Sequence, residues 1–198
     1  MPTLTAVLNG KQLAQVCAEW LDILSVRVHG TRVDDEFADL EMSGGQYPEQ
    51  GNSTYLTWIS SVSLKPRDLL EVTFSDAGNT SHAGKTIDEL FPNEPASPEK
   101  VDFAPTSEMF EELRAKQHIR CGHGFTLTTS EGVNYTGRTN DSEHGFGFSV
   151  VWNSHRPERA NLSLHSYTID SMEHKQPMRD HVREYIQAPY SVVFRVDA

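Results

Sequence analysis

The sequence contains no long run of apolar residues. Its densest apolar stretch, residues 20–28, is interrupted by Asp22, Ser25 and Arg27, whereas a membrane-spanning helix needs roughly 20 consecutive apolar residues. The first residues, Met-Pro-Thr-Leu-Thr-Ala, include neither the basic segment nor the long apolar segment of a secretory signal. We therefore expect a cytoplasmic protein that does not cross a membrane.

Cysteine is almost absent. Cys17 and Cys121 are the only two cysteines among 198 residues, and they lie far apart in the sequence. Small secreted domains depend on several disulfides, whereas cytoplasmic proteins keep their thiols reduced. The scarcity of cysteine therefore fits the cytoplasm, and we expect both residues to be small buried hydrophobic side chains.

Clustered positive charge is also lacking. The chain has 17 Lys and Arg against 28 Asp and Glu, a net charge of −11. Residues 1–95 carry 6 basic and 14 acidic residues, whereas residues 96–198 carry 11 and 14. Nucleic acid is not an expected partner, because phosphate binding depends on clustered Lys and Arg. An acidic surface either attracts a basic protein or keeps the chain in solution.

Motifs specific to one reaction are absent as well. The chain has no Gly-x-Ser-x-Gly, no His-Glu-x-x-His and no Cys-x-x-Cys, which mark hydrolase nucleophiles, zinc proteases and paired thiolate ligands. The glycines of residues 122–124 and 144–147 form stretches too short for a phosphate-binding loop, and glycines that enter a strand more often mark bulges or corners. The sequence favours a binding protein over an enzyme.

What the sequence does contain is a series of strand patterns. Asn9-Gly10 between two short apolar runs predicts a hairpin with a two-residue turn, because both residues tolerate positive φ. In residues 69–74, apolar side chains alternate with polar ones, as in a strand with one buried face. The other predicted strands are residues 24–29, 37–43, 54–60, 125–129, 133–137, 146–152, 162–169 and 191–196. The predicted fold class is mainly β, with two antiparallel β-sandwich or β-barrel-like domains and a few short helices.

Three short helices are predicted between the strands. Residues 86–91 begin with Thr and carry Glu three residues later, which is the pattern of a capping box. Residues 107–116 follow a Thr that can cap them and have apolar side chains on one side. Residues 179–186 carry Val182, Tyr185 and Ile186 at helical spacing, which predicts one or two turns of helix.

The distribution of proline predicts a boundary between domains. Four prolines lie between residues 92 and 105 among small polar residues, a composition that favours extended backbone. We predict an acidic β-rich domain at residues 1–91, a linker at 92–105, and a second β-rich domain with a short N-terminal helix at 106–198. In the alternative, the proline segment is strapped across one sandwich whose halves share a core.

A trace of duplication is present in two of the predicted strands. Residues 54–60 and residues 148–154 each contain a strand that ends in Trp, followed two residues later by Ser. Either the two halves arose from one ancestor, or two unrelated strands end in the same way.

Histidine gathers in the second half of the chain, which holds seven of the nine. His118, Cys121 and His123 place three soft ligands within six residues, and zinc is the metal that such ligands would hold. A second cluster at a recognisable spacing is missing. The alternative is that these are surface and loop histidines, and we expect no cofactor unless zinc binds here.

The segment that follows the strand at 146–152 is the best candidate for binding. It exposes Asn153, His155, Arg156 and Arg159 on a loop, and loops held by a rigid sheet often carry binding residues. We group His144, at the other border of this strand, with them. The alternative is an ordinary polar turn with its arginines paired to a local carboxylate.

Some of these segments resemble known proteins. Leu8-Asn9-Gly10, the residues from Leu64 to Asp68, and the run from His144 to Arg159 are similar to segments of small acidic bacterial proteins of unassigned function. The resemblance implies a bacterial intracellular setting. It assigns no catalytic residue to this chain.

Together these patterns favour a binding protein whose partner is another protein rather than a small molecule. One form of it is an immunity or inhibitor protein that covers a basic toxin or nuclease, as the net charge of −8 of residues 1–95 suggests. The alternative is a histidine-dependent or metal-assisted enzyme with its site in the C-terminal domain.

Overall fold

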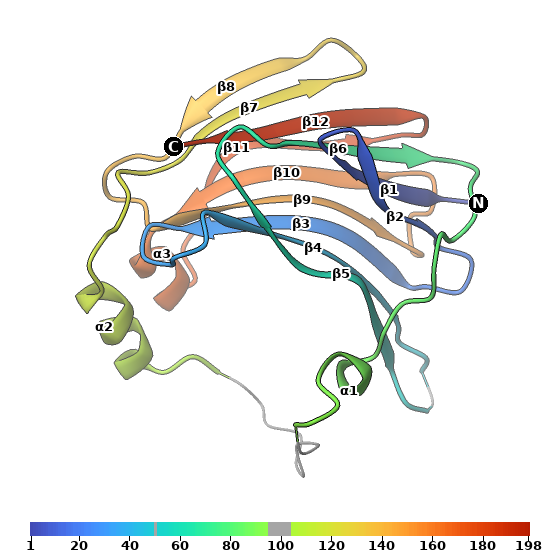
Figure 1. Cartoon of the computed structure of the whole chain (residues 1–198), viewed down its shortest axis with the longest axis horizontal. Helices are drawn as coiled ribbons and strands as arrows, with labels where there is room; N and C mark the ends of the chain where they lie inside the picture. The colour runs from blue at the N-terminus through green and yellow to red at the C-terminus, as the bar shows by residue number, and fades with distance from the viewer. Residues whose placement is uncertain (50, 95–103) are drawn as a thin grey trace.

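The computed structural model describes residues 1–49, 51–94 and 104–198, which form two six-stranded antiparallel sheets stacked as two layers (Figure 1). Sheet I has the order β2 (Lys11–Cys17), β1 (Thr3–Leu8), β6 (Leu69–Ser75), β12 (Tyr190–Asp197), β7 (Gly124–Thr129), β8 (Asn134–Arg138). Sheet II has the order β11 (Arg179–Ile186), β10 (Ala160–Tyr167), β9 (Gly145–Asn153), β3 (Ile23–Thr31), β4 (Ala38–Gln46), β5 (Thr54–Leu64). The predicted class, mainly β with antiparallel sheets in a sandwich, is confirmed.

Each half of the chain contributes three adjacent strands to each sheet. In the N-terminal half, β1 and β2 form a hairpin in sheet I, β3, β4 and β5 form a meander in sheet II, and β6 returns to pair with β1. The C-terminal half repeats this path with β7 and β8, then β9, β10 and β11, and finally β12, which pairs with β7. The two halves therefore have the same topology.

A pseudo-two-fold axis relates the two halves where β3 pairs with β9. β3 and β9 begin and end 122 positions apart. Val26 pairs with Val150 and Val28 pairs with Phe148, so each valine of β3 faces the equivalent of the other. The β3–β4 and β9–β10 connections, residues 32–37 and 154–159, have the same length. The alignment of residues 54–60 with residues 148–154 is wrong, because those segments lie in β5 and β9, which are not equivalent strands. The equivalent of β9 is β3.

The two predicted domains coincide with these two halves but do not have separate cores. β6 pairs with β12 along sheet I, and β3 pairs with β9 along sheet II. One hydrophobic cluster contains buried residues of both halves, and Phe148 stacks on Phe194 with ring centroids 4.4 Å apart. The prediction of two independent units is thus corrected to two repeats in one sandwich. Most of the predicted linker, residues 95–103, lies outside the described residues.

Alternation of apolar and polar side chains explains why these segments are strands. In β9, Phe146, Phe148, Val150 and Trp152 are buried between the sheets, while the residues between them face outward. The first hairpin turns at Asn9 and Gly10 with φ of 52° and 79°, as predicted for a two-residue turn. Strands with one apolar face must bury that face, and the second sheet covers it.

The helices are short, and one predicted helix is a strand. α1 (Ile87–Leu90) begins with the predicted capping box, and α2 (Ser107–Ala115) is capped by the Thr106 hydroxyl. α3 (Ile169–Glu173) follows β10. Residues 179–186 are β11, because a spacing of four between Val182 and Ile186 fits a strand as well as a helix. Within the described ranges, no helix is long and apolar enough to cross a membrane.

Candidate functional site

The structure divides the predicted site residues between the two ends of the sandwich. His144 directly precedes β9, whereas Asn153 ends it. Nine residues of strand separate them by about 30 Å, so the predicted binding set does not form one site. The end at which β9 begins is called the polar end below, because the chain buries Arg32, Glu143, His123 and His144 there.

The three predicted metal ligands differ in their exposure. His118 and Cys121 are exposed, whereas His123 is fully buried. The His123 ring packs between Phe37 and Phe146, and its Nε2 lies 3.3 Å from the Phe37 carbonyl oxygen. Burial lowers the pKa of His123 to about 4, so it is neutral at pH 7. Across residues 1–49, 51–94 and 104–198, no three His, Cys, Asp or Glu side chains gather at metal-binding distance. The expectation that both cysteines are buried holds for Cys17 and is wrong for Cys121.

His144 and His118 lie close together at the polar end. Their ring centroids are 6.4 Å apart, and both line a cavity of about 280 Å³ between α3 and the loop before β9. Arg32 of the β3–β4 connection holds that loop in place, because its guanidinium donates to the carbonyl oxygens of Asp141 and Glu143. Burial is the main reason why the pKa of His144 is lowered. The cavity is therefore bordered by a loop that Arg32 holds in place and by a histidine whose pKa is lowered by burial.

A hydrogen-bonded relay joins the two sheets at the same end. His181 of β11 bonds through Nδ1 to the Tyr135 hydroxyl at 2.6 Å and through Nε2 to the Ser166 hydroxyl at 2.8 Å. This order of groups resembles that of a serine nucleophile with its base. Ser166, however, has no exposed surface, and burial lowers the pKa of His181. The geometry therefore fits a bond between sheets I and II better than a reactive serine.

The predicted binding loop at the opposite end is held by local contacts. The Arg159 guanidinium lies 3.8 Å from the centroid of the Tyr185 ring, and the Trp152 indole donates to the Pro157 carbonyl oxygen at 3.1 Å. Asn153 lies at the end of β9, while His155 and Arg156 remain exposed on the loop. These two are the members of the predicted set that are free to meet a partner.

Carboxylates of the N-terminal half form no ion pair within residues 1–49, 51–94 and 104–198. In the part of the chain that the structure describes, every ion pair has both members between residues 114 and 197. The N-terminal acids gather most densely on the β3–β4 turn and the outer face of β4. This acidic surface comprises Asp34, Asp35, Glu36, Asp39 and Glu41.

A groove runs beside the acidic surface, on the outer face of sheet II where the two repeats meet. Its volume is about 430 Å³, and its walls include Arg27, His29, Glu41 and His165. Gly147 forms part of the floor, because a Cβ there would lie 2.8 Å from the His165 ring. Burial lowers the pKa of His165. Pockets at the junction of two units are common ligand sites.

A second pocket lies at the edge of sheet II, where β5 is irregular. Ser43 pairs with Thr57 and Met42 pairs with Ile59, so Trp58 is an extra residue that bulges from the strand. A further irregularity follows at Ser61, whose φ is 66°. Bulges protect sheet edges and often lie beside functional sites, where they redirect a side chain.

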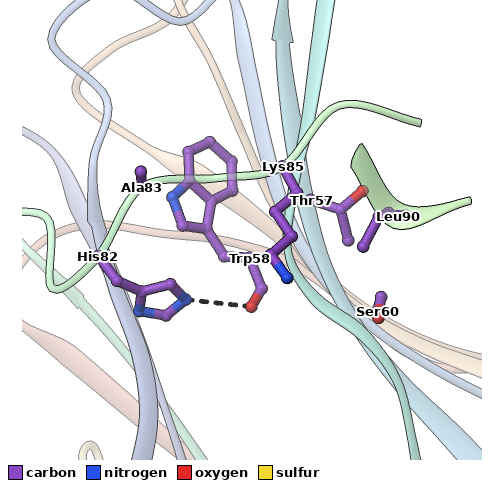
Figure 2. Close-up of a pocket in the computed structure, with 7 residues that line it drawn as sticks. All are labelled: Thr57, Trp58, Ser60, His82, Ala83, Lys85 and Leu90. Atoms are coloured by element: carbon purple, nitrogen blue, oxygen red, sulfur yellow. Dashed lines mark hydrogen bonds between the residues drawn. The ribbon is translucent and has the colours of Figure 1, made fainter. Parts of the chain in front are cut away.

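The wall opposite β5 is a strap formed by residues 81–86. The strap pairs with β5 through two backbone hydrogen bonds of 2.9 Å between Thr57 and Lys85. His82 bonds through Nε2 to the Trp58 carbonyl oxygen at 3.2 Å, as Figure 2 shows. A Cβ on Gly84 would lie 2.9 Å from the indole, so only glycine lets the strap pack this closely. The resulting pocket has a volume of about 270 Å³.

None of the residues that build this strap pocket was predicted from the sequence. The pocket is lined by Thr57, Trp58, Ser60, His82, Ala83, Lys85 and Leu90. One signal was available: Trp58 and Ile59 are adjacent and both buried, which a regular strand with one buried face does not allow.

Comparison with known proteins gives no counterpart for this arrangement. The sequence matches no family model, and no curated protein and no solved structure is significantly similar to the chain.

Proposed function

We propose that this chain is a binding protein that recognises a basic protein partner through its acidic surface, Asp34, Asp35, Glu36, Asp39 and Glu41. The observation that carries the proposal is the absence, within residues 1–49 and 51–94, of any ion pair to these carboxylates. Carboxylates without an ion pair leave an uncompensated negative field, which raises the rate of encounter with a cationic surface. The acids of the β3–β4 turn contribute most of this field, because Glu41 lies opposite Arg27 in the strand register.

The surroundings of the acidic surface suit recognition rather than catalysis. The β3–β4 turn is held by Arg120, which donates to the Thr31 carbonyl oxygen at 2.5 Å and to the Asp35 carbonyl oxygen at 3.2 Å. The acids are therefore presented on a fixed turn. Glu41 belongs both to the acidic surface and to the groove over Gly147, so a side chain of the partner could enter the groove.

An immunity or inhibitor protein is one biological form of this function. Such a protein covers the cationic substrate site of a toxin or nuclease, and its affinity depends on complementary charge. The net charge of −8 over residues 1–95 agrees with that role. A recovered partner that is an enzyme should then lose its activity at a one-to-one ratio with this chain.

Affinity capture with matched charge variants tests the proposal. The variant D34N/D35N/E36Q removes three charges from the acidic surface, and E108Q/E111Q/E112Q removes three from α2. We expect wild type and the α2 variant to retain the same basic protein from an extract of the native cell, and the turn variant to lose it. Equal retention by the turn variant, or an acidic partner, would contradict the proposal.

A further inference from the structure

The strap pocket at the edge of sheet II has a composition unlike the rest of this acidic chain. Its seven lining residues include Lys85 and no Asp or Glu, although the chain carries a net charge of −11. Lys85 has no ion pair within the described residues. The hydroxyls of Thr57 and Ser60 also belong to the lining. Lys85 and the hydroxyls supply hydrogen-bond donors, and no carboxylate lines the pocket with them. The neighbouring Glu89 carboxylate accepts instead from the backbone amide and hydroxyl of Thr86, and these bonds lower its pKa together with a smaller contribution from Lys85.

The Trp58 indole adds a donor that the protein itself leaves unused. Trp58 is 8% exposed, and its Nε1 has no hydrogen-bond acceptor among the described residues. Buried donors without a partner are rare in folded proteins, and each calls for an explanation. Figure 2 shows the nitrogen on the side of the ring that faces Ala83 and His82, two residues that line the pocket.

His82 also lines the pocket, but it does not accept a hydrogen bond from the Trp58 indole. The Ser81 hydroxyl oxygen accepts the Gln15 amide at 3.0 Å and lies 2.9 Å from His82 Nδ1, while His82 Nε2 faces the Trp58 carbonyl oxygen. The carbonyl oxygen can only accept, so Nε2 carries the ring proton and donates it there, while Nδ1 accepts from the Ser81 hydroxyl. Both ring nitrogens are therefore occupied, and the pocket keeps a surplus of donors.

We propose that the strap pocket binds a small organic carboxylate, with its negative oxygens on Lys85 and the Trp58 indole and its apolar body against Leu90 and Ala83. A benzene molecule occupies a cavity of roughly 150 Å³. The strap pocket, at about 270 Å³, therefore accepts a ligand of benzoate size or slightly larger. This site is separate from the acidic surface.

Titration of the labelled protein with benzoate tests the proposal. The Trp58 indole resonance in the ¹H–¹⁵N spectrum is assigned by its loss in W58F. Benzoate should shift it saturably with an apparent Kd at or below about 1 mM, and uncharged benzamide should not. K85M should weaken benzoate binding by about tenfold or more, whereas K65M, which removes a lysine from the β5–β6 turn, should leave it unchanged.

A second arm separates two sources of the carboxylate. The dipeptide acetyl-Ala-Phe with a free carboxyl end is compared with its amide. Tighter binding of the acid than of benzoate would assign the site to the carboxyl end of a peptide, and weaker binding would assign it to a small metabolite. Absence of a saturable shift with benzoate up to about 10 mM, equal binding by K85M, or equal binding of benzamide would overturn the proposal. Capture through the acidic surface would be unaffected by that failure.

Discussion

The two halves of this protein share one topology but differ in the net charge of one equivalent connection. The β3–β4 connection, residues 32–37, contains Arg32 with three acids, Asp34, Asp35 and Glu36, whereas the β9–β10 connection, residues 154–159, contains Arg156 and Arg159 with one acid, Glu158. Equivalent positions of the core stay apolar: Val28 and Leu40 of the first repeat correspond to Val150 and Leu162 of the second, and all four are buried. The comparison teaches that the repeats conserve the buried scaffold and differ in the charge of this exposed connection.

The halves also differ in their ion pairs and in the contacts of their buried tryptophans. In the C-terminal half, the Trp152 indole donates to a carbonyl oxygen and the carboxylate of Glu143 lies 3.4 Å from Arg179. In the N-terminal half, the Trp58 indole has no acceptor within the described ranges. Buried polar atoms without a partner nevertheless occur in both repeats, because His123 Nδ1, His144 Nδ1 and Arg159 Nε also lack one among the described residues. The repeats differ in their ion pairs, all of which lie between residues 114 and 197 in the described part of the chain.

Separation of the halves is expected to have the largest effect. Expressed alone, residues 1–94 expose the edges of β6 and β3, and residues 104–198 expose those of β12 and β9. Unpaired edges and an open core favour aggregation. We expect neither half to unfold cooperatively in a denaturant titration, and both together to assemble into a folded complex. A half that folds cooperatively as a monomer would show that the repeats are independent.

Substitution of the two buried tryptophans should have the next largest effect, and the loss of stability should differ between the repeats. Trp152 is 3% exposed and fills the core, so W152A should lower the free energy of unfolding by about 3–5 kcal/mol. W58F removes the unpaired indole N–H and keeps an aromatic ring, so it should change this free energy by less than about 1 kcal/mol. Urea unfolding measures both. A large loss in W58F would mean that the indole N–H is satisfied in solution.

Acid should destabilise the protein through the polar end. The pKa of folded His123 is about 4, below its ordinary value of 6.5, so the unfolded chain takes up the proton first. Stability is complete above pH 6.5 and is lost as the pH falls toward 4, by about 3 kcal/mol in full. Unfolding of wild type and H123F between pH 7 and 4 checks this. H123F should lose less stability with acid, and an unchanged pH dependence would contradict the assignment.

Neutralisation of the acidic turn should have the smallest effect on stability. Asp34, Asp35 and Glu36 are exposed, so D34N/D35N/E36Q should alter the free energy of unfolding by less than about 0.5 kcal/mol. Thermal unfolding of this variant and of the α2 variant E108Q/E111Q/E112Q measures the difference. A marked loss in the turn variant would mean that the acids support the fold and not a partner.

The parts of the fold that depend on local patterns could be predicted from the sequence. Alternation of apolar residues identifies β6 and β9, Asn9-Gly10 fixes the first turn, and the Thr86–Glu89 pair predicts α1. These signals act between residues that are close in sequence. They therefore give elements, and the mainly β class follows from their number.

The pairing of the repeats and the candidate sites could not be predicted in this way. The β3–β9 and β6–β12 pairs join residues that are more than a hundred positions apart, and no local pattern encodes such a choice. For the same reason His144 and Asn153, close in sequence, lie at opposite ends of β9, while Thr57 of β5 pairs with Lys85 of the strap and Trp58 and Lys85 line one pocket. A site is assembled by the fold, so it is visible only once the strands are placed.

The salt dependence of binding to the captured partner tests the central claim most directly. Calorimetric titrations at about 50 mM and about 200 mM salt compare wild type with D34N/D35N/E36Q, since added salt screens exposed charges. We predict that wild type binds more tightly at the lower salt, and that the turn variant binds weakly with little response to salt. Equal affinities and equal salt responses for the two proteins would contradict recognition through the acidic surface.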